Sequence, residues 1–408
     1  MDVLVARQPI FDKKLQVFGY ELLYRGLMGK DDKRFDGDRA TSEVIINSFQ
    51  ILDIDSISSN KVVFINFTEK LIKDKVPSFL SNEKVIVEIL EDIHFDSQMV
   101  EACKELKEKG YVLALDDFIF EDLPSFNAVL PFIDIIKVDI LQTNFSDVKI
   151  RIMKTLLGKK KKFLAEKVET YQQYQSALEL GFEYFQGYFF EKPYVIVGKE
   201  IESYQITYLQ MIAEIQASQS FDKLADIVNR DIGLSYKLLR LINSPFYGRG
   251  CKIKSTKEAL IMLGLQEVKK WLMLLMLRES AKEKPDELMR MSLVRAKFAE
   301  NISPLLHMEG RKAEFFLLGL FSTLDAILDK PMEEIVQYIP FEDDLLAAYQ
   351  KDSDSIFYKV VQIIKLYEKG QWDKADRWLE ETALSPDDVN ERFFNSIIWA
   401  DHILETIT

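Results

Sequence analysis

The first half of the chain alternates short apolar runs with amphipathic segments. The runs are rich in β-branched and aromatic residues, and they are too short for free-standing helices. Between several of them lie helical patterns, such as residues 97–109, which Gly110 is placed to cap. Strands separated by helices predict a parallel sheet covered on both faces. The strand-like runs are residues 62–67, 84–90, 112–118, 134–140, 162–168 and 184–190.

Two further apolar runs come before these, at residues 3–9 and 15–24. The polar segment Asp12-Lys13-Lys14 lies between them and predicts a hairpin. Counted with the six later runs, the hairpin brings the number of strands to eight, which suits a (β/α)8 barrel with an irregular beginning. We therefore predict an α/β first domain, a modified TIM-type barrel, over residues 1–198.

The pattern changes near Ile201. From there to the end, apolar residues recur at three- and four-residue spacing and strand-like runs disappear. Ser255, with Glu258 three positions later, has the form of a capping box that opens a helix, and Gly264 is placed to end it. We predict an all-α second domain over residues 199–408. Its predicted helix faces are Phe221, Leu224, Ile227 and Val228, and then Tyr236, Leu239 and Ile242, before a break at Asn243-Ser244-Pro245.

Other apolar stripes of this half are interpreted as bundle core, including Trp271 and Met273, and residues 372–379 as one more amphipathic helix. Residues 234–241 fit two interpretations: they pack internally, or they form a groove for a partner.

Composition narrows the function classes. The net charge is −13 and the pI is near 5.0, which disfavours nucleic-acid binding because a phosphate backbone needs a basic face. Met1 begins no basic apolar leader, and the longest apolar run, residues 271–277, is far short of the roughly 20 residues that span a bilayer. We expect a cytoplasmic protein with no DNA and no membrane among its partners. Cys103 and Cys251 are interpreted as buried thiols.

The polar residues that interrupt the predicted strands carry the candidate chemistry. In a barrel the carboxyl ends of all parallel strands meet at one rim. Carboxylates gathered there stay ionised together only if cations neutralise them, and oxygen-rich sites select hard ions such as Mg²⁺ or Mn²⁺. Two such ions can activate a water and stabilise an in-line phosphoryl displacement. The residues are Glu21, Asn66, Glu88, Asp116, Asp117, Lys137, Asp139, Glu166, Glu169 and Gln186.

A single carboxylate at a strand end is more often a helix N-cap or an ion-pair partner, so the interpretation depends on the whole set. Arg25 stands four residues after Glu21 and could reach a phosphate.

These strand-end residues resemble the EAL family of cyclic di-GMP phosphodiesterases over roughly residues 1–195. Glu21-Leu22-Leu23-Tyr24-Arg25 is similar to the segment that names the family, with leucine in place of alanine. Further segments resemble, in order, the asparagine strand, the paired-glutamate strand, the double aspartate, the lysine strand and the last two motifs of the family. They are Ile65-Asn66-Phe67-Thr68, Glu88-Ile89-Leu90-Glu91, Asp116-Asp117-Phe118, Ile136-Lys137-Val138-Asp139, residues 165–170, and Phe185-Gln186-Gly187-Tyr188 with Lys192-Pro193.

The resemblance implies a role for each matching residue. It implies that Lys137 orients or activates the attacking water, that Glu166 completes the metal shell, that Arg25 holds a phosphate, and that Gln186 supports the substrate pocket. It also implies that Glu91 and Glu169 support a loop beside the site. The metal ligands that it implies, for two Mg²⁺ or Mn²⁺ ions if the barrel is active, are Glu21, Asn66, Glu88, Asp116 and Asp117.

Two departures from the family pattern leave the activity open. Active members carry a glycine-rich turn after the double aspartate and phenylalanine, whereas this chain continues Ile119-Phe120-Glu121-Asp122. Glycines allow a tight backbone path that these side chains do not easily copy. Lys167 replaces a small residue that is common in the family. Weak, regulated and absent turnover all fit this pattern.

The second half resembles the HDOD output domain, a helical relative of the HD hydrolases, over about residues 200–350. The metal-binding histidine–aspartate pair of those hydrolases would fall near Ser322-Thr323, and neither residue is a useful transition-metal ligand, so a non-catalytic module is implied. The segments that carry the resemblance are residues 224–228, Arg230-Asp231, residues 234–244, Phe246-Tyr247-Gly248, Ile253-Lys254-Ser255, residues 259–264 and Gly319-Leu320-Phe321.

Three functions follow from the two resemblances. The first is a hydrolase that opens cyclic di-GMP to the linear dinucleotide. The second is a receptor that binds cyclic di-GMP without useful turnover and relays occupancy through the helical module to a protein partner. The third is an interaction scaffold that no longer binds nucleotide. A homodimer is compatible with each of them.

Overall fold

The structure is a computed structural model that divides into two compact units. It describes residues 3–26, 54–90, 93–192, 213–215, 217, 220–230, 232–242, 255–282, 284–336, 343–350 and 352–407. The first unit comprises Met1–Phe190 with Tyr367–Trp372, and the second comprises Glu191–Leu366 with Asp373–Thr408. The predicted boundary between residues 198 and 199 lies outside the described residues and stays a prediction.

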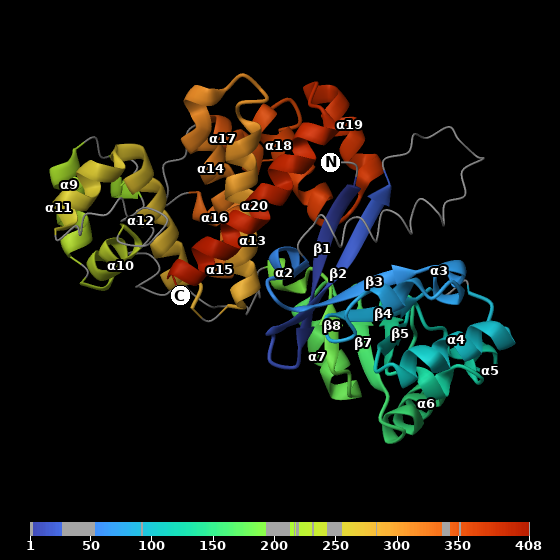
Figure 1. The fold of residues 1–408 in the computed structure, drawn as a ribbon. Coiled ribbons are helices and arrows are strands. Elements are labelled where there is room, and N and C mark those ends of the chain that lie inside the picture. The colour runs from blue at the N-terminus through green and yellow to red at the C-terminus, as the bar shows by residue number, and fades with distance from the viewer. Residues whose placement is uncertain are drawn as a thin grey trace. The chain divides into compact units, whose positions relative to one another are not determined.

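The first unit is a closed eight-stranded barrel whose strands follow one another in sequence order (Figure 1). β1 pairs with β2 and with β8 in antiparallel orientation, and every other neighbouring pair is parallel. This arrangement confirms the predicted barrel and its irregular beginning. The strands are β1 (Val3–Asp12), β2 (Val17–Gly26), β3 (Val62–Phe67), β4 (Val85–Ile89), β5 (Val112–Leu115), β6 (Ile135–Asp139), β7 (Lys162–Glu166) and β8 (Tyr184–Gln186).

Local interactions explain why the chain reverses between β1 and β2. The carboxylate of Asp12 accepts hydrogen bonds from the backbone N–H groups of Lys14 (2.8 Å) and Gln16 (3.0 Å). Leu15 takes the left-handed conformation, with φ of 58°. An aspartate that binds the backbone two and four residues ahead favours a turn over a continued strand. The predicted hairpin is confirmed.

One layer of apolar side chains fills the barrel. It combines Ile10 of β1 with one residue from each of β3 to β8, and Phe18, Val62 and Val112 pack against it. Since side chains alternate along a strand, the residue that follows a member of this layer faces outward. Ile65 and Val87, which follow Phe64 and Ile86, are fully buried on that outer face. The layer consists of Ile10, Phe64, Ile86, Ala114, Ile135, Leu164 and Tyr184.

Helices cover the outer face of the parallel strands (Figure 1). α4 ends at the C-cap Lys109, and Gly110 follows with φ of 87°, as the sequence predicts. α7 begins with a capping box between Thr170 and Gln173. The helices of this unit are α2 (Ile54–Ser58), α3 (Glu69–Lys73), α4 (Ser97–Glu108), α5 (Leu123–Phe126), α6 (Asp147–Gly158) and α7 (Tyr171–Leu180).

The second unit is all helical in its described residues, as predicted. α12 is buried from Val268 to Leu277, including Trp271 and Met273, and α13 packs against α14 and α20. The helices are α9 (Phe221–Asn229), α10 (Ile232–Ile242), α11 (Thr256–Leu263), α12 (Leu265–Ser280), α13 (Asp286–Ile302), α14 (Lys312–Phe321), α15 (Leu324–Leu328), α16 (Met332–Ile335), α17 (Asp343–Tyr349), α19 (Trp372–Thr382) and α20 (Pro386–Ile407), while α18 (Ile356–Glu368) ends in the first unit.

The predicted helix face of Tyr236, Leu239 and Ile242 is wrong at Tyr236, whose side chain on α10 is 66% exposed. Ile242 of the same face is buried. Leu238 and Ile242, four residues apart on the same helix, are the buried pair. A tyrosine can lie in a core or on a solvent-exposed surface, because its ring is apolar and its hydroxyl is polar. The predicted break at Asn243-Ser244-Pro245 and the thiol of Cys251 lie outside the described residues.

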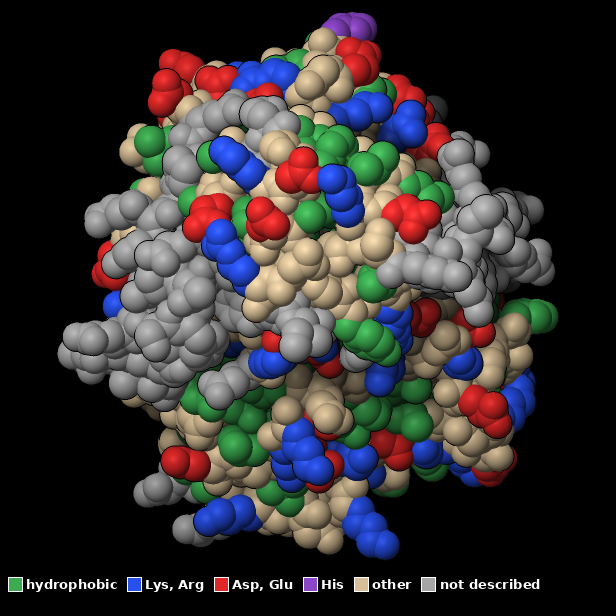
Figure 2. All heavy atoms as spheres, turned by 90° about the vertical axis from the view of Figure 1, so that its left-hand side faces the viewer, with side chains coloured by type: hydrophobic (Ala, Val, Ile, Leu, Met, Phe, Trp, Pro, Cys, Tyr) green, Lys and Arg blue, Asp and Glu red, His purple; other side chains and the backbone are tan. Residues whose placement is uncertain are grey.

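The face of the molecule in Figure 2 carries acidic and basic side chains intermixed with apolar ones. The coloured side chains of that face form no continuous basic surface. None of the described helices has the length and apolar character needed to cross a bilayer.

Candidate functional site

Six strands of the barrel repeat one arrangement at their carboxyl ends. Two positions beyond the residue in the apolar layer, each carries a polar residue on the strand or directly after it. Residues two apart on a strand share a face, so these side chains form a polar layer on top of the apolar one. The pairs are Phe64 and Asn66, Ile86 and Glu88, Ala114 and Asp116, Ile135 and Lys137, Leu164 and Glu166, and Tyr184 and Gln186.

Lys137 lies at the centre of this polar layer. Its side chain is 1% exposed, and its Nζ forms ion pairs with four carboxylates. The distances from Nζ are 2.7 Å to Asp116, 2.9 Å to Glu166 and 3.6 Å to Glu21, and the fourth partner is Glu88. Side chains from five strands therefore converge on one point, as the sequence predicts for the polar residues of the barrel.

Two amides complete the layer on the side of β2. Glu21 accepts hydrogen bonds from Asn66 Nδ2 at 2.9 Å and from Gln186 Nε2 at 2.5 Å. Gln186 Nε2 also donates to Gln8 Oε1 at 3.0 Å. Sequence reasoning missed Gln8. The signal for it is the hairpin register, which pairs Gln8 with Glu21 and places it two residues from Ile10 of the apolar layer.

The charges of the layer do not balance. Burial raises the pKa of Glu88 well above its usual range, and Glu21 and Asp116 raise it further, while Lys137 opposes the rise. Burial also raises the pKa of Glu166, again against Lys137. Burial alone would lower the pKa of Lys137, but the four carboxylates raise it well above its usual range. One ammonium therefore serves four carboxylates, and they stay ionised together only with additional positive charge.

The oxygen atoms of the polar layer suit a bound cation as the source of that additional positive charge. Among the described residues, several buried oxygens have no hydrogen-bond partner, including Asn66 Oδ1, Glu88 Oε2 and Glu166 Oε2. Buried acceptors of this kind are uncommon in proteins, and carboxylate and amide oxygens are the ligands that Mg²⁺, Mn²⁺ and Ca²⁺ prefer. In the described part of the chain, no group of three histidine, cysteine or acidic side chains forms a ready-made metal site. The carboxylates are instead gathered on Lys137.

Asp117 lies beside the layer and has a different partner. Its carboxylate is 3.7 Å from Lys167 Nζ, which donates a hydrogen bond of 2.6 Å to Asp139. Burial alone would raise the pKa of Asp139, but Lys167 and the backbone N–H groups of Leu141 and Gln142 hold it below its usual value. Asp117 and Lys167 both adopt left-handed backbone, with φ of 38° and 55°.

The segment after Asp117 departs from a glycine-rich turn in a defined way. Phe118 and Phe120 are buried and their rings meet edge to face at 5.1 Å, while Ile119 is 49% exposed. Phe118 N donates to the carbonyl of Lys137 at 2.9 Å, so the segment is tied to β6. Aromatic packing therefore holds the chain where glycines would leave it free to bend.

For two further predicted site residues the structure describes little or nothing, and a third, Glu169, lies on the surface. The backbone of Arg25 lies on β2 opposite Leu4, but its side chain is outside the description, as is all of Glu91. Glu169 is exposed, and its backbone N–H donates to Gln173 Oε1 at 2.8 Å at the start of α7.

Gly187 fixes the path of the chain after β8. Its φ is 142°, and a Cβ at this position would lie 2.1 Å from the carbonyl oxygen of Val168. Val168 N donates to the carbonyl of Gln186 at 2.9 Å. This close approach requires glycine and holds the ends of β7 and β8 together next to Glu166 and Gln186.

The hydroxyls of Ser322 and Thr323 form hydrogen bonds in the helical unit. Ser322 Oγ donates to the carbonyl of Gly319 at 2.7 Å, and the buried Thr323 shares a hydrogen bond with Ser292. Arg295, 2% exposed, donates to Glu191 at 2.9 Å within the same unit. Ser322 and Thr323 are thus engaged inside the unit, while Glu191 keeps one buried oxygen, Oε1, without a hydrogen-bond partner among the described residues.

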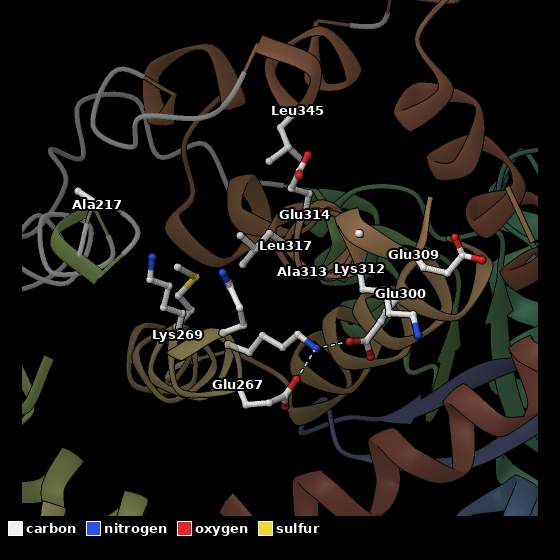
Figure 3. Close-up of a pocket in the computed structure, with 14 residues that line it drawn as sticks. Ala217, Glu267, Lys269, Glu300, Glu309, Lys312, Ala313, Glu314, Leu317 and Leu345 are labelled. Atoms are coloured by element: carbon white, nitrogen blue, oxygen red, sulfur yellow. Dashed lines mark hydrogen bonds and ion pairs between the residues drawn. The ribbon is translucent and has the colours of Figure 1, made fainter. Parts of the chain in front are cut away.

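A cavity of about 640 Å³ also lies in the helical unit, between α12, α13, α14 and α17 (Figure 3). Lys270 lines it and forms ion pairs with Glu267 (2.9 Å) and Glu300. Its lining includes both signs of charge, with three lysines and four glutamates among the lining residues. It is separate from the polar layer of the barrel, which is the better candidate site because its oxygens lack partners.

Comparison with known proteins agrees with the two units. The EAL domain matches residues 33–193, and the HDOD domain matches residues 205–338. Among solved structures, the Bacillus subtilis YkuI protein, with an EAL domain and in complex with substrate c-di-GMP and calcium, is 24% identical with a TM-score of 0.37. That likeness covers 46% of this chain and 54% of that chain.

Two relatives match nearly the whole chain. The uncharacterized protein YuxH of Bacillus subtilis (strain 168) is 34% identical over 415 residues, which are 99% of this chain and 100% of that protein. The cyclic di-GMP phosphodiesterase CdgJ of Vibrio cholerae is 32% identical over 402 residues, which are 98% of this chain and 92% of that protein. The chain belongs to the family of proteins that join an EAL domain to a C-terminal HDOD domain.

Proposed function

We propose that the barrel is a metal-dependent phosphodiesterase that binds cyclic di-GMP and opens it to the linear dinucleotide. The observation that carries the proposal is the polar layer, in which four carboxylates share one ammonium while buried oxygens of Asn66, Glu88 and Glu166 lack partners. The relationship to CdgJ, a cyclic di-GMP phosphodiesterase, supports the choice of substrate. The cytoplasmic location expected from the sequence belongs to the same proposal.

In this proposal each side chain has one task. Glu21, Asn66, Glu88, Asp116 and Asp117 would hold Mg²⁺ or Mn²⁺, with two ions in the active state. Such ions, when bound, would supply positive charge to the phosphate oxygens and lower the pKa of a bound water.

The other polar residues of the site act on the water and on the substrate. Lys137 donates to the attacking water and orients it in line with the bond to be broken. Glu166 would complete the metal shell, directly or through water, and accepts the proton of the attacking water. The new P–O bond forms, and the bond to the leaving ribose oxygen breaks as that oxygen gains a proton from solvent. Arg25 holds a phosphate, Gln186 positions Glu21 in the substrate pocket, and Glu91 and Glu169 support the neighbouring loops.

Product analysis tests the proposal. The full chain is incubated with cyclic di-GMP and Mn²⁺ or Mg²⁺, and the linear dinucleotide is separated and quantified. We expect product only in the presence of metal. In Glu88→Gln the rate of product formation should fall at least roughly a hundredfold, since the Glu88 carboxylate contacts Lys137 at the centre of the layer. Glu83→Gln is the matched control because Glu83 is exposed in the turn before β4. No product from the wild type with either metal would refute hydrolysis.

A receptor is the second candidate, and the segment after Asp117 favours it. Packed phenylalanines replace flexible glycines there, and Lys167 already engages Asp117. A barrel of this kind would bind cyclic di-GMP and release it unchanged. Calorimetry with the dinucleotide distinguishes the candidates: heat of binding without linear product supports the receptor, and the absence of both leaves the interaction scaffold.

We also propose that the helical unit is a non-catalytic output module that contacts a protein partner. Support comes from Ser322 and Thr323, whose hydroxyls are engaged inside the unit and lack the chemistry of a metal-binding pair. Variants of the full chain that carry substitutions only in the helical unit, and none in the barrel, should still bind the nucleotide but should no longer bind the protein partner. Loss of nucleotide binding in the same variants would contradict this division of roles.

A further inference from the structure

Lys167 holds two carboxylates at the edge of the polar layer. Its Nζ lies 2.6 Å from Asp139 Oδ2 and 3.7 Å from Asp117 Oδ1. Asp139 faces Glu166 in the register of β6 and β7, so this second ammonium borders the group that surrounds Lys137. The acidic residues thus divide between two lysines: four carboxylates around Lys137 and two around Lys167.

The oxygens of Asp139 are fully engaged. Oδ1 accepts from the backbone N–H groups of Leu141 (2.8 Å) and Gln142 (3.2 Å), and Oδ2 accepts from Lys167. The Asp139 side chain is only 7% exposed, so solvent offers little replacement for these bonds. A cation that approached Asp139 would have to displace the ammonium of Lys167.

The backbone places Lys167 for this contact. It follows Glu166 directly and adopts left-handed φ of 55°, a conformation that costs a lysine free energy and costs glycine almost none. Asp117, the other partner in this contact, also has a left-handed backbone, with φ of 38°. A strained lysine between two acids is more than a solvated surface residue, although its side chain is 47% exposed.

We propose that Lys167 is an internal counter-cation that competes with a divalent ion for Asp117 and Asp139. The inference rests on the proposed metal site of the barrel and refines it. One ion binds at the side of Glu21, Asn66, Glu88 and Asp116, and a second binds weakly because Lys167 already holds its ligands. The same competition makes occupancy of the second position, and with it turnover, depend on the free metal concentration.

Removal of the ammonium tests this directly. Binding of Mn²⁺ to the full chain is measured without nucleotide by calorimetry and by the electron paramagnetic resonance signal of free Mn²⁺. Lys167→Met removes the charge and keeps the length of the side chain, and Lys167→Gly removes the charge and suits the left-handed backbone. Both variants should bind the second ion roughly tenfold more tightly or better, because a positive charge within about 4 Å of its site is gone.

Lys160→Met is the matched control. Lys160 also has left-handed backbone, with φ of 62°, and is exposed in the turn between α6 and β7, at the opposite end of the strand. It removes the same net charge and should leave both binding steps unchanged. Adding Asp139→Asn to Lys167→Met should abolish the gain in affinity, since it removes a ligand of the second ion.

The outcomes separate this inference from the proposed function. If the wild type binds Mn²⁺ and both Lys167 variants bind it identically, or if Lys160→Met tightens binding equally, the role of Lys167 is overturned and the proposed metal site stands. If neither the wild type nor the variants bind Mn²⁺, the metal-dependent function fails and this inference falls with it.

Discussion

Lys137→Met is the substitution that most directly probes how the polar layer is held together. It keeps most of the volume of the side chain and removes the ammonium that contacts Glu21, Glu88, Asp116 and Glu166. Glu88 is fully buried, so water does not replace the lost partner. The barrel of the metal-free variant must then bury carboxylates with no compensating cation, or protonate them.

The structure sets the size of the effect. Breaking a buried ion pair by removing one partner typically costs about 3–5 kcal/mol, whereas removing one partner of an exposed pair costs about 0–1 kcal/mol. Lys84→Met is the exposed comparison, since Lys84 pairs with Asp55 at 2.6 Å with both side chains more than a third exposed. The free energy of unfolding of the barrel should fall by the larger amount only in Lys137→Met.

Hydrogen exchange of peptides that contain β4 and β6 measures the barrel without interference from the helical unit. A loss of about 3–5 kcal/mol accelerates exchange of protected amides by about 150- to 5,000-fold. Added Mn²⁺ should slow exchange more in Lys137→Met than in the wild type, because a divalent ion can replace the lost charge. If exchange in metal-free Lys137→Met stays within about fivefold of the wild type, as expected for Lys84→Met, the carboxylates do not depend on Lys137.

Three further predictions concern packing and reactivity. Gly187→Ala should lower barrel stability by roughly 2 kcal/mol or more, because its Cβ would lie 2.1 Å from Val168 O; unchanged exchange in the β8 peptide would contradict this. Gly319→Ala should destabilise the helical unit similarly, since its Cβ would lie 2.1 Å from Arg295 O, whereas Gly310→Ala, with open space around it, should not; melting temperatures of the two variants decide the matter. Burial raises the pKa of the Cys103 thiol to about 12, so native protein at pH 8 should resist alkylation there and react only when unfolded; peptide mass spectrometry that finds rapid native modification would show that the thiol is accessible.

Much of the architecture can be predicted from the sequence because the spacing of apolar residues reflects which side chains each strand or helix buries. Short apolar runs separated by helical patterns predict the eight strands, and the hairpin with Asp12 predicts the irregular beginning. Since parallel strands end at one rim, the polar residues at positions such as Glu88, Asp116 and Lys137 had to meet. The convergence of these residues therefore follows from strand direction and alternation alone.

Which side chains contact one another at that rim was decided only by the tertiary structure. Gln8 lies on a strand that runs opposite to the others, so its place beside Gln186 depends on the closure of β1 on β8. The contact of Lys167 with Asp139 depends on a left-handed backbone angle that no local signal encodes. Tyr236 turned out exposed because helical spacing defines a face but not its neighbour. Sequence determines which side a residue occupies on its own element, whereas the groups it meets depend on distances between elements far apart in the chain, and these are set by packing of the whole barrel or bundle.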